Sequence, residues 1–97
     1  MRKITLNNFD YQVDDKLSAF KIAQPVSNNV EFYGHNNDGN VFVQFRSGIT
    51  YIYDYVSKKV QQELDESDSP TTFIRTVFKD YRFTKFNQKL IVPFILD

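Results

Sequence analysis

The chain has 97 residues, 41% of them apolar and 25% charged, with ten phenylalanines and six tyrosines. This length supports one domain with one modest core, and this composition is too aromatic for a disordered chain. Twelve basic residues balance twelve acidic ones and cysteine is absent, so the chain has no overall field for nucleic acid or an anionic membrane, and no disulfide, thiolate metal site or cysteine nucleophile.

The first 25 residues contain three short alternations of apolar and polar residues, at Ile4–Leu6, Phe9–Val13 and Ala19–Ala23. Pairs of Asn and Asp residues separate them. Such alternation is typical of strands, so this N-terminal extension is expected to extend a sheet. Pro25 has no N–H group to donate to a sheet, which places an edge or a boundary with the main unit there.

Residues 30–55 predict a three-stranded antiparallel meander. The predicted strands are Val30–His35, Val41–Arg46 and Thr50–Tyr55. Asn36–Asn40 contains Asp-Gly and the second connection contains Ser-Gly, and such residues adopt the positive φ angles that tight hairpin turns require.

Both faces of this meander are predicted to be apolar, which is expected of a sheet that is covered on both sides. Tyr51 and Tyr53 are separated by one residue, so their rings project from the same face, together with Tyr55. Two interpretations follow. The rings either pack in the core with their hydroxyls at its rim, which we favour, or form a platform on which nucleic-acid bases stack.

The hydrophobic period then changes from two to about four. Val56, Val60 and Leu64 form one stripe of a short helix that Ser57 caps. Ser69 is expected to cap a second helix, with Pro70 at its first position. This helix, extending to about Asp80, carries an aromatic stripe made of Phe73, Val77, Phe78 and Tyr81.

The C-terminal arm, residues 84–97, contains the apolar run Leu90–Leu96. Pro93 excludes a central strand, so we expect an outer strand or an extended arm that the rest of the protein must cover. The predicted fold class is therefore α+β: one domain, residues 1–97, with an antiparallel meander, two short helices packed on one face, and terminal segments that add strands.

Several of these segments together resemble the KTSC domain. They are Val26–Val30, Phe45–Tyr53 with its central Tyr-Ile-Tyr, Val56, and the positions Phe73, Val77 and Tyr81. This small domain is named from the carboxyl end of certain bacterial lysyl-tRNA synthetases and also occurs as a separate protein in bacteria and phages. The resemblance extends over about residues 26–83.

The chain departs from the family pattern at three places. It has Gly34-His35-Asn36 where the family usually has Gly-Tyr-Asp, Val56-Ser57 where Val-Pro is usual, and Pro70 where a glycine is common. The resemblance implies a fold but no settled activity. RNA binding has been suggested for the family only from its association with a tRNA synthetase.

Basic residues alternate with aromatic ones after the start of the second helix. This candidate phosphate-contacting surface consists of Arg75, Lys79, Arg82 and Lys85, joined by Lys58 and Lys59 on the first helix. Arg75, Lys79 and Arg82 are spaced to share one side of the second helix and its exit. The alternative is an ordinary solvated helix face, which the zero net charge favours.

The sequence provides no basis for catalysis. His35 is the only histidine, and one histidine beside an Asp is too little for a metal site or a catalytic relay. The three glycines are isolated, so no phosphate-binding loop exists. We therefore expect no enzyme activity, no cofactor and no metal.

The leading hypothesis is a small binding module for RNA or single-stranded nucleic acid in the cytoplasm, without membrane contact. The first alternative is a protein-interaction module, encoded by a phage or mobile element, that modulates a host protein. Self-association through an edge strand or the C-terminal arm is the third hypothesis. We expect a cytoplasmic protein because no signal-peptide run or membrane span is present.

Overall fold

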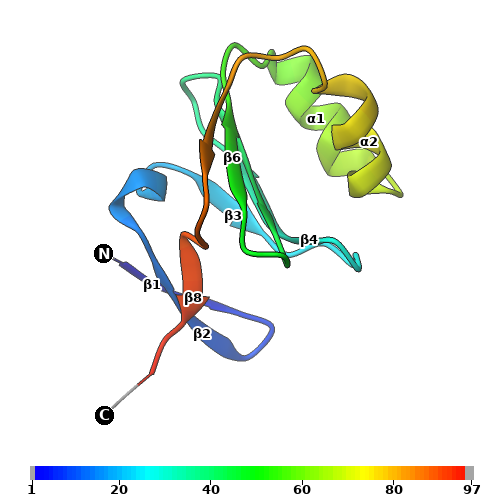
Figure 1. Cartoon of the computed structure of the whole chain (residues 1–97). Helices are drawn as coiled ribbons and strands as arrows, with labels where there is room; N and C mark the ends of the chain where they lie inside the picture. The colour runs from blue at the N-terminus through cyan, green and yellow to red at the C-terminus, as the bar shows by residue number, and fades with distance from the viewer. Residues whose placement is uncertain (1, 96–97) are drawn as a thin grey trace.

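The structure is a computed structural model that describes residues 2–95 and has two antiparallel sheets and two helices (Figure 1). The predicted α+β class is confirmed. The larger sheet has the order β3-β4-β5-β6-β7, and the smaller has the order β1-β2-β8. The strands of the whole chain are β1 (Arg2–Leu6), β2 (Phe9–Val13), β3 (Lys21–Ala23), β4 (Val30–His35), β5 (Val41–Phe45), β6 (Thr50–Tyr53), β7 (Phe83–Phe86) and β8 (Ile91–Pro93). The α-helices are α1 (Lys58–Glu66) and α2 (Pro70–Val77).

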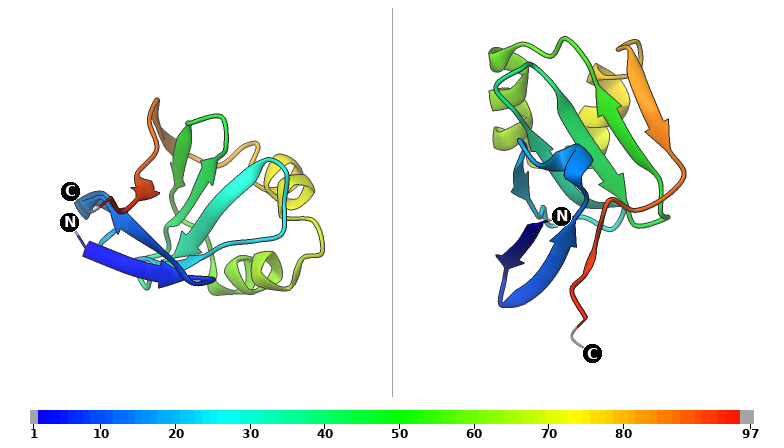
Figure 2. Two further views of the ribbon diagram at one scale, coloured as in Figure 1. Left: turned by 90° about the horizontal axis from the view of Figure 1, so that it is seen from below. Right: turned by 90° about the vertical axis from the view of Figure 1, so that its left-hand side faces the viewer.

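The larger sheet is covered on both faces. Helices α1 and α2 lie on one face, and the smaller sheet lies on the other (Figures 1 and 2). The predicted meander is β4-β5-β6, and β7 continues it as the last strand. Of the N-terminal segments only β3 extends this sheet. β1 and β2 are the expected strands, but they pair with each other and with β8 in a second sheet that covers the other apolar face of the larger sheet.

The turn between β4 and β5 forms as its residues predict. The Asn36 side-chain oxygen accepts hydrogen bonds from the backbone N–H groups of Asp38 at 3.0 Å and Asn40 at 2.9 Å. Gly39 has φ of 82°, a value that glycine adopts without steric cost. Local side-chain bonding therefore fixes this hairpin.

Strand β4 contains an irregularity that the sequence does not reveal. Its register with β5 shifts between Val30 and Phe32. Residues two apart on a regular strand share a face, but here Val30 faces the helices and Phe32 faces the smaller sheet. A β-bulge has this effect because one extra residue reverses the alternation of side chains.

The third strand of the meander, β6, is two residues shorter than predicted. It ends at Tyr53, and Tyr55 has φ of 60° and is 82% exposed. The prediction that Tyr55 shares the face of Tyr51 and Tyr53 was therefore wrong. The chain bends away here because the backbone N–H of Val56 donates to the Gly39 carbonyl at 2.8 Å, which directs the chain into α1.

The two helices begin where predicted, but only one has the predicted cap. The Ser57 side chain accepts from the Val60 N–H and caps α1. The cap expected at Ser69 was wrong: its side chain makes no capping bond and its hydroxyl bonds the Thr72 hydroxyl at 3.0 Å instead. Helix α2 also ends at Val77, before the predicted Asp80.

The core under the helices contains the predicted stripes of both helices. Its buried members include Val56, Leu64, Ile74 and Phe78, which pack on Val41, Val43 and Tyr53 of the sheet. Val60, Phe73, Val77 and Tyr81 pack around it, partly buried. Burial of these apolar side chains holds the helices against the sheet.

The fully buried polar side chain of Gln44 lies on the other face of the sheet. Its amide nitrogen donates to the Ile91 carbonyl at 2.8 Å and to Glu31 at 2.9 Å. Its amide oxygen accepts from the backbone N–H groups of Leu90 and Ile91. The amide thus connects the C-terminal segment to β5.

The apolar C-terminal run forms the outer strand that Pro93 predicts. Strand β8 lies at the edge of the smaller sheet, and Leu90 and Ile91 are buried. Leu96, the end of the predicted run, lies outside the described residues. Within residues 2–95 no helix has both the length and the apolar character needed to span a membrane.

Candidate ligand-binding site

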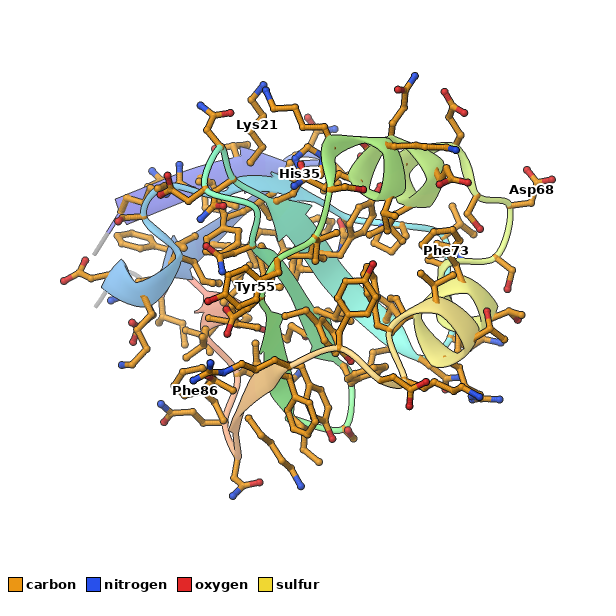
Figure 3. All side chains as sticks on the ribbon, turned by 90° about the horizontal axis from the view of Figure 1, so that it is seen from above. Lys21, His35, Tyr55, Asp68, Phe73 and Phe86 are labelled. Carbon is orange, nitrogen blue, oxygen red and sulfur yellow. The ribbon has the colours of Figure 1, made fainter. Side chains whose placement is uncertain are left out.

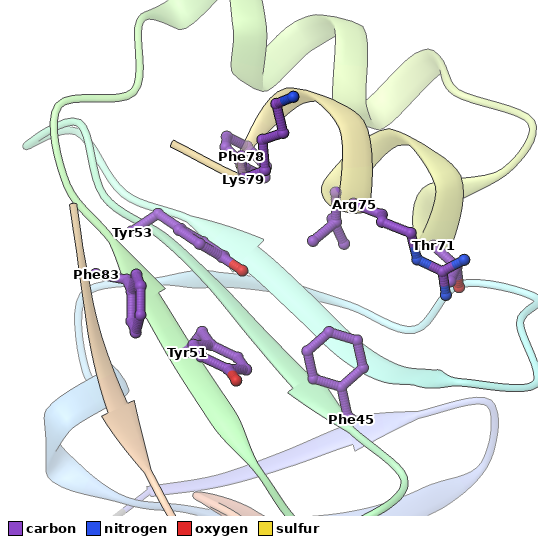
Figure 4. Close-up of a pocket in the computed structure, with 9 residues that line it drawn as sticks. Phe45, Tyr51, Tyr53, Thr71, Arg75, Phe78, Lys79 and Phe83 are labelled. Atoms are coloured by element: carbon purple, nitrogen blue, oxygen red, sulfur yellow. The ribbon is translucent and has the colours of Figure 1, made fainter. Parts of the chain in front are cut away.

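A pocket of about 360 Å³ lies between the larger sheet and α2 (Figure 4). Strands β5, β6 and β7 contribute aromatic side chains, and α2 with the turn after it contributes the opposite wall. We call this cavity the aromatic pocket. It is lined by Phe45, Tyr51, Tyr53, Thr71, Ile74, Arg75, Phe78, Lys79 and Phe83.

Three of the rings form a continuous stack. Tyr53 stacks on Phe78 with ring centres 4.8 Å apart, and on Tyr51 with centres 5.9 Å apart. Phe45 and Phe83 meet the Tyr51 ring at interplanar angles of 88° and 72°. Tyr51 is therefore flanked by two rings that stand nearly perpendicular to its own, one on each neighbouring strand.

The two tyrosines differ in burial. Tyr53 is 7% exposed, whereas Tyr51 is half-buried. Burial, and then the neighbouring Tyr51, raises the pKa of Tyr53 to about 12. Tyr53 therefore belongs to the core, and Tyr51 presents part of its ring to the pocket. Phe83 is 50% exposed and forms an open wall.

Two cations line this pocket. Arg75 and Lys79 are both exposed, and neither forms an ion pair with another described residue. Lys85 is the register partner of Tyr51 across β6 and β7, so its side chain projects from the same face. The structure thus brings three of the six predicted basic residues to the tyrosine face.

The other three predicted basic residues lie elsewhere. The Arg82 guanidinium is 3.9 Å from the Asp54 carboxylate, and its side chain is 77% exposed. Lys58 and Lys59 belong to α1, and Lys58 lines a separate hollow beside His35. These three do not line the aromatic pocket.

One polar cluster was missed from the sequence. Asp65 of α1 accepts a hydrogen bond from the Tyr33 hydroxyl at 3.0 Å and contacts the His35 Nε2 atom at 2.9 Å. His35 therefore lies against α1 rather than serving only as a turn residue (Figure 3). Burial, and then the Asp65 charge, raises the pKa of Tyr33 to about 12.

The signal for this cluster was weak. Tyr33 and His35 are two residues apart on one strand, so their side chains share a face. Nothing in the sequence selects Asp65 among the acidic residues of α1 as their partner. In the part of the chain that the structure describes, no three His, Cys, Asp or Glu side chains converge as metal ligands.

Residues 27–83, more than half of the chain, match the family model of the KTSC domain. The chain belongs to the KTSC domain family. The crystal structure of a KTSC domain protein from Yersinia pestis is similar, with a TM-score of 0.65 and 24% sequence identity over 70% of this chain and 99% of that chain. A search of curated proteins gave no match.

The KTSC region contains the whole aromatic pocket. Every residue that lines the pocket lies within residues 27–83. Strands β1, β2 and β8, which make the smaller sheet, lie outside that region. The pocket is thus built by the family domain, and the terminal segments build the cover of the opposite face.

Proposed function

We propose that this KTSC domain is a small non-enzymatic binding module, and that its ligand is single-stranded nucleic acid, with RNA the first to be tested. The observation that carries this proposal is the combination, on one pocket, of a partly accessible Tyr51 ring with two cations, Arg75 and Lys79, that form no ion pair within residues 2–95. A nucleic-acid base offers a planar face that stacks on the Tyr51 ring. The phosphates of the strand carry the negative charge that attracts Arg75 and Lys79.

The magnitudes are compatible with this ligand. Each base stacked on an aromatic side chain contributes ~1–3 kcal/mol. Each phosphate that a cation neutralises releases counterions, so such binding weakens steeply as salt rises. Because the chain carries no net charge, attraction depends on the local cations and binding is expected to be weak at high salt.

The test is fluorescence anisotropy with a short labelled RNA and a matched single-stranded DNA, each titrated at low and at moderate salt. Tyr51→Leu removes the stacking surface, and Arg75→Glu with Lys79→Glu reverses the charge. Both are expected to reduce affinity at least tenfold, since each removes one of the two contributions.

The matched control is Lys58→Glu with Lys59→Glu, which makes the same charge change on α1, away from the pocket. It is expected to leave most of the affinity intact. Equal losses in both double variants would contradict a local site, and no binding of RNA or DNA at low salt would contradict the proposed ligand. Capture of a protein through Tyr51 would then favour the protein-interaction alternative.

A further inference from the structure

The aromatic pocket continues into a second hollow of about 260 Å³, lined mostly by polar side chains. The two cavities share Phe45, Thr71 and Arg75. We call the second cavity the polar hollow, and its remaining lining residues are Asn28, Asn29, Arg46 and Ser47. Residues from the β5–β6 turn, from α2 and from the segment before β4 thus meet around one depression.

We propose that the polar hollow binds the phosphate of a single nucleotide whose base occupies the aromatic pocket. This inference rests on the proposed function and narrows it to a site for one nucleotide. Phe45 lines both cavities, one lined mainly by rings and the other mainly by polar side chains, and a nucleoside monophosphate likewise has an aromatic base at one end and a phosphate at the other. The aromatic pocket, at about 360 Å³, lies within the usual size range of small-ligand sites.

Arg75 is the cation that belongs to both cavities. Its side chain extends from α2 toward Thr71, at the Phe45 end, whereas the Lys79 nitrogen points away from the tyrosines (Figure 4). The Arg75 guanidinium presents several N–H donors in a plane, a geometry that matches phosphate oxygens. Arg75 is therefore the better-placed phosphate ligand of the two.

Arg46 provides a second guanidinium to the lining of the polar hollow. Its Nε atom donates to the Ser27 carbonyl at 3.3 Å, which holds the side chain in place. The nearest carboxylate, Glu31, is 4.0 Å from Nη1 and is also bound by Lys89 at 3.1 Å and by Gln44. Much of the Arg46 donor capacity is thus available to an anion.

The neighbouring surface limits how many phosphates of a strand the site contacts. Beyond Asn28 and Arg75 a further hollow opens, and Asp68 lies on it. A carboxylate there repels a second phosphate. On the other side, Phe83 forms the open wall of the aromatic pocket. The Asp68 carboxylate thus limits the polar hollow to about one phosphate.

The experiment is calorimetry with thymidine, thymidine monophosphate and inorganic phosphate at low salt, on the whole chain. The monophosphate is expected to bind about tenfold more tightly than the nucleoside, because one charge-assisted phosphate contact has this effect. Arg46→Gln and Arg75→Gln are each expected to remove this tenfold ratio between the affinities for the monophosphate and the nucleoside. Tyr51→Leu is expected to weaken the binding of both ligands by a similar factor.

Arg82→Gln is the matched control, since it removes a guanidinium that lines neither cavity. Arg46→Lys keeps the charge and is expected to retain part of the ratio, which separates lost phosphate binding from lost folding. Equal affinity for nucleoside and monophosphate, or an unchanged ratio in Arg46→Gln, would overturn the inference. If an oligonucleotide binds and the monophosphate does not, this inference fails and the proposed function stands; if neither binds, both fail.

Discussion

The two faces of the larger sheet are both apolar, but they are covered in different ways. On the side of the smaller sheet, Phe32 and Phe42 are fully buried and the Gln44 amide has all of its hydrogen bonds. On the helix side, α2 leaves a cavity over Tyr51 and two cations without ion pairs among the described residues.

We expect this difference to separate the residues that stabilise the fold from those that bind a ligand. A closed face with satisfied polar groups contributes to folding and offers no surface to a ligand. An open cavity lined by rings and cations leaves interactions unused in the free protein, and a ligand can use them. The closed face is therefore expected to control stability, and the helix face to control binding.

The largest effect on stability is expected for Phe42→Ala, compared with Phe83→Ala. Phe42 is fully buried, so its truncation costs about 3–5 kcal/mol. Phe83 is 50% exposed, so its truncation is expected to cost about 1 kcal/mol or less. Denaturant unfolding measures both, and equal losses would show that the two faces are packed alike.

Gln44→Leu is expected to reduce the free energy of unfolding by about 3 kcal/mol. It leaves the Leu90 and Ile91 backbone groups without partners, and each buried unpaired group costs about 1–3 kcal/mol. The control is Gln62→Ala on the exposed surface of α1, expected to stay within about 0.5 kcal/mol. A Gln44→Leu protein as stable as the control would exclude the amide as the connection to β8.

Stability is expected to fall as pH rises from 10 to about 12. The pKa of Tyr53 and of Tyr33 is raised from 10.0 to about 12 in the folded state, so the unfolded chain loses these protons first and is favoured in that interval. Urea unfolding at several pH values measures the fall. Tyr53→Phe and Tyr33→Phe are each expected to reduce it, and a pH-independent stability in both variants and the parent would contradict this prediction.

The smallest effects concern the helix caps. Ser57→Ala is expected to cost about 1 kcal/mol because its side chain accepts from the Val60 N–H. Ser69→Ala is expected to cost less, since the Ser69 side chain makes no capping bond. Thermal unfolding of the two variants compares them directly, and a larger loss at Ser69 would reverse the assignment.

Local signals predicted most of the fold. The turn at Asn36, the cap at Ser57 and the four-residue spacing of Val56, Val60 and Leu64 depend on neighbours in sequence, so the pattern alone identified them. The bulge in β4 and the second sheet depend on contacts between distant segments. The Gln44 connection to Leu90 spans 46 residues, and no local pattern encodes such a contact.

The candidate site was predicted only in part. Alternation placed Tyr51 and Tyr53 on one face, and helical spacing grouped Arg75 with Lys79, but nothing in the sequence placed Arg75 beside the tyrosines. Phe45 and Phe83 could not be assigned to the pocket, because their positions depend on the pairing of β5, β6 and β7. Arg46 was predicted as the last residue of the second strand, but β5 ends at Phe45, and the Arg46 side chain lines the polar hollow.

The most direct test of the binding proposal is a nuclear magnetic resonance titration of the labelled chain with a short single-stranded RNA at low salt. We predict that shift changes concentrate at Tyr51, Phe83 and Arg75 and leave Phe42 and Gln44 unchanged. Changes confined to the smaller sheet, or no changes at any concentration of RNA, would contradict the assignment of recognition to the helix face.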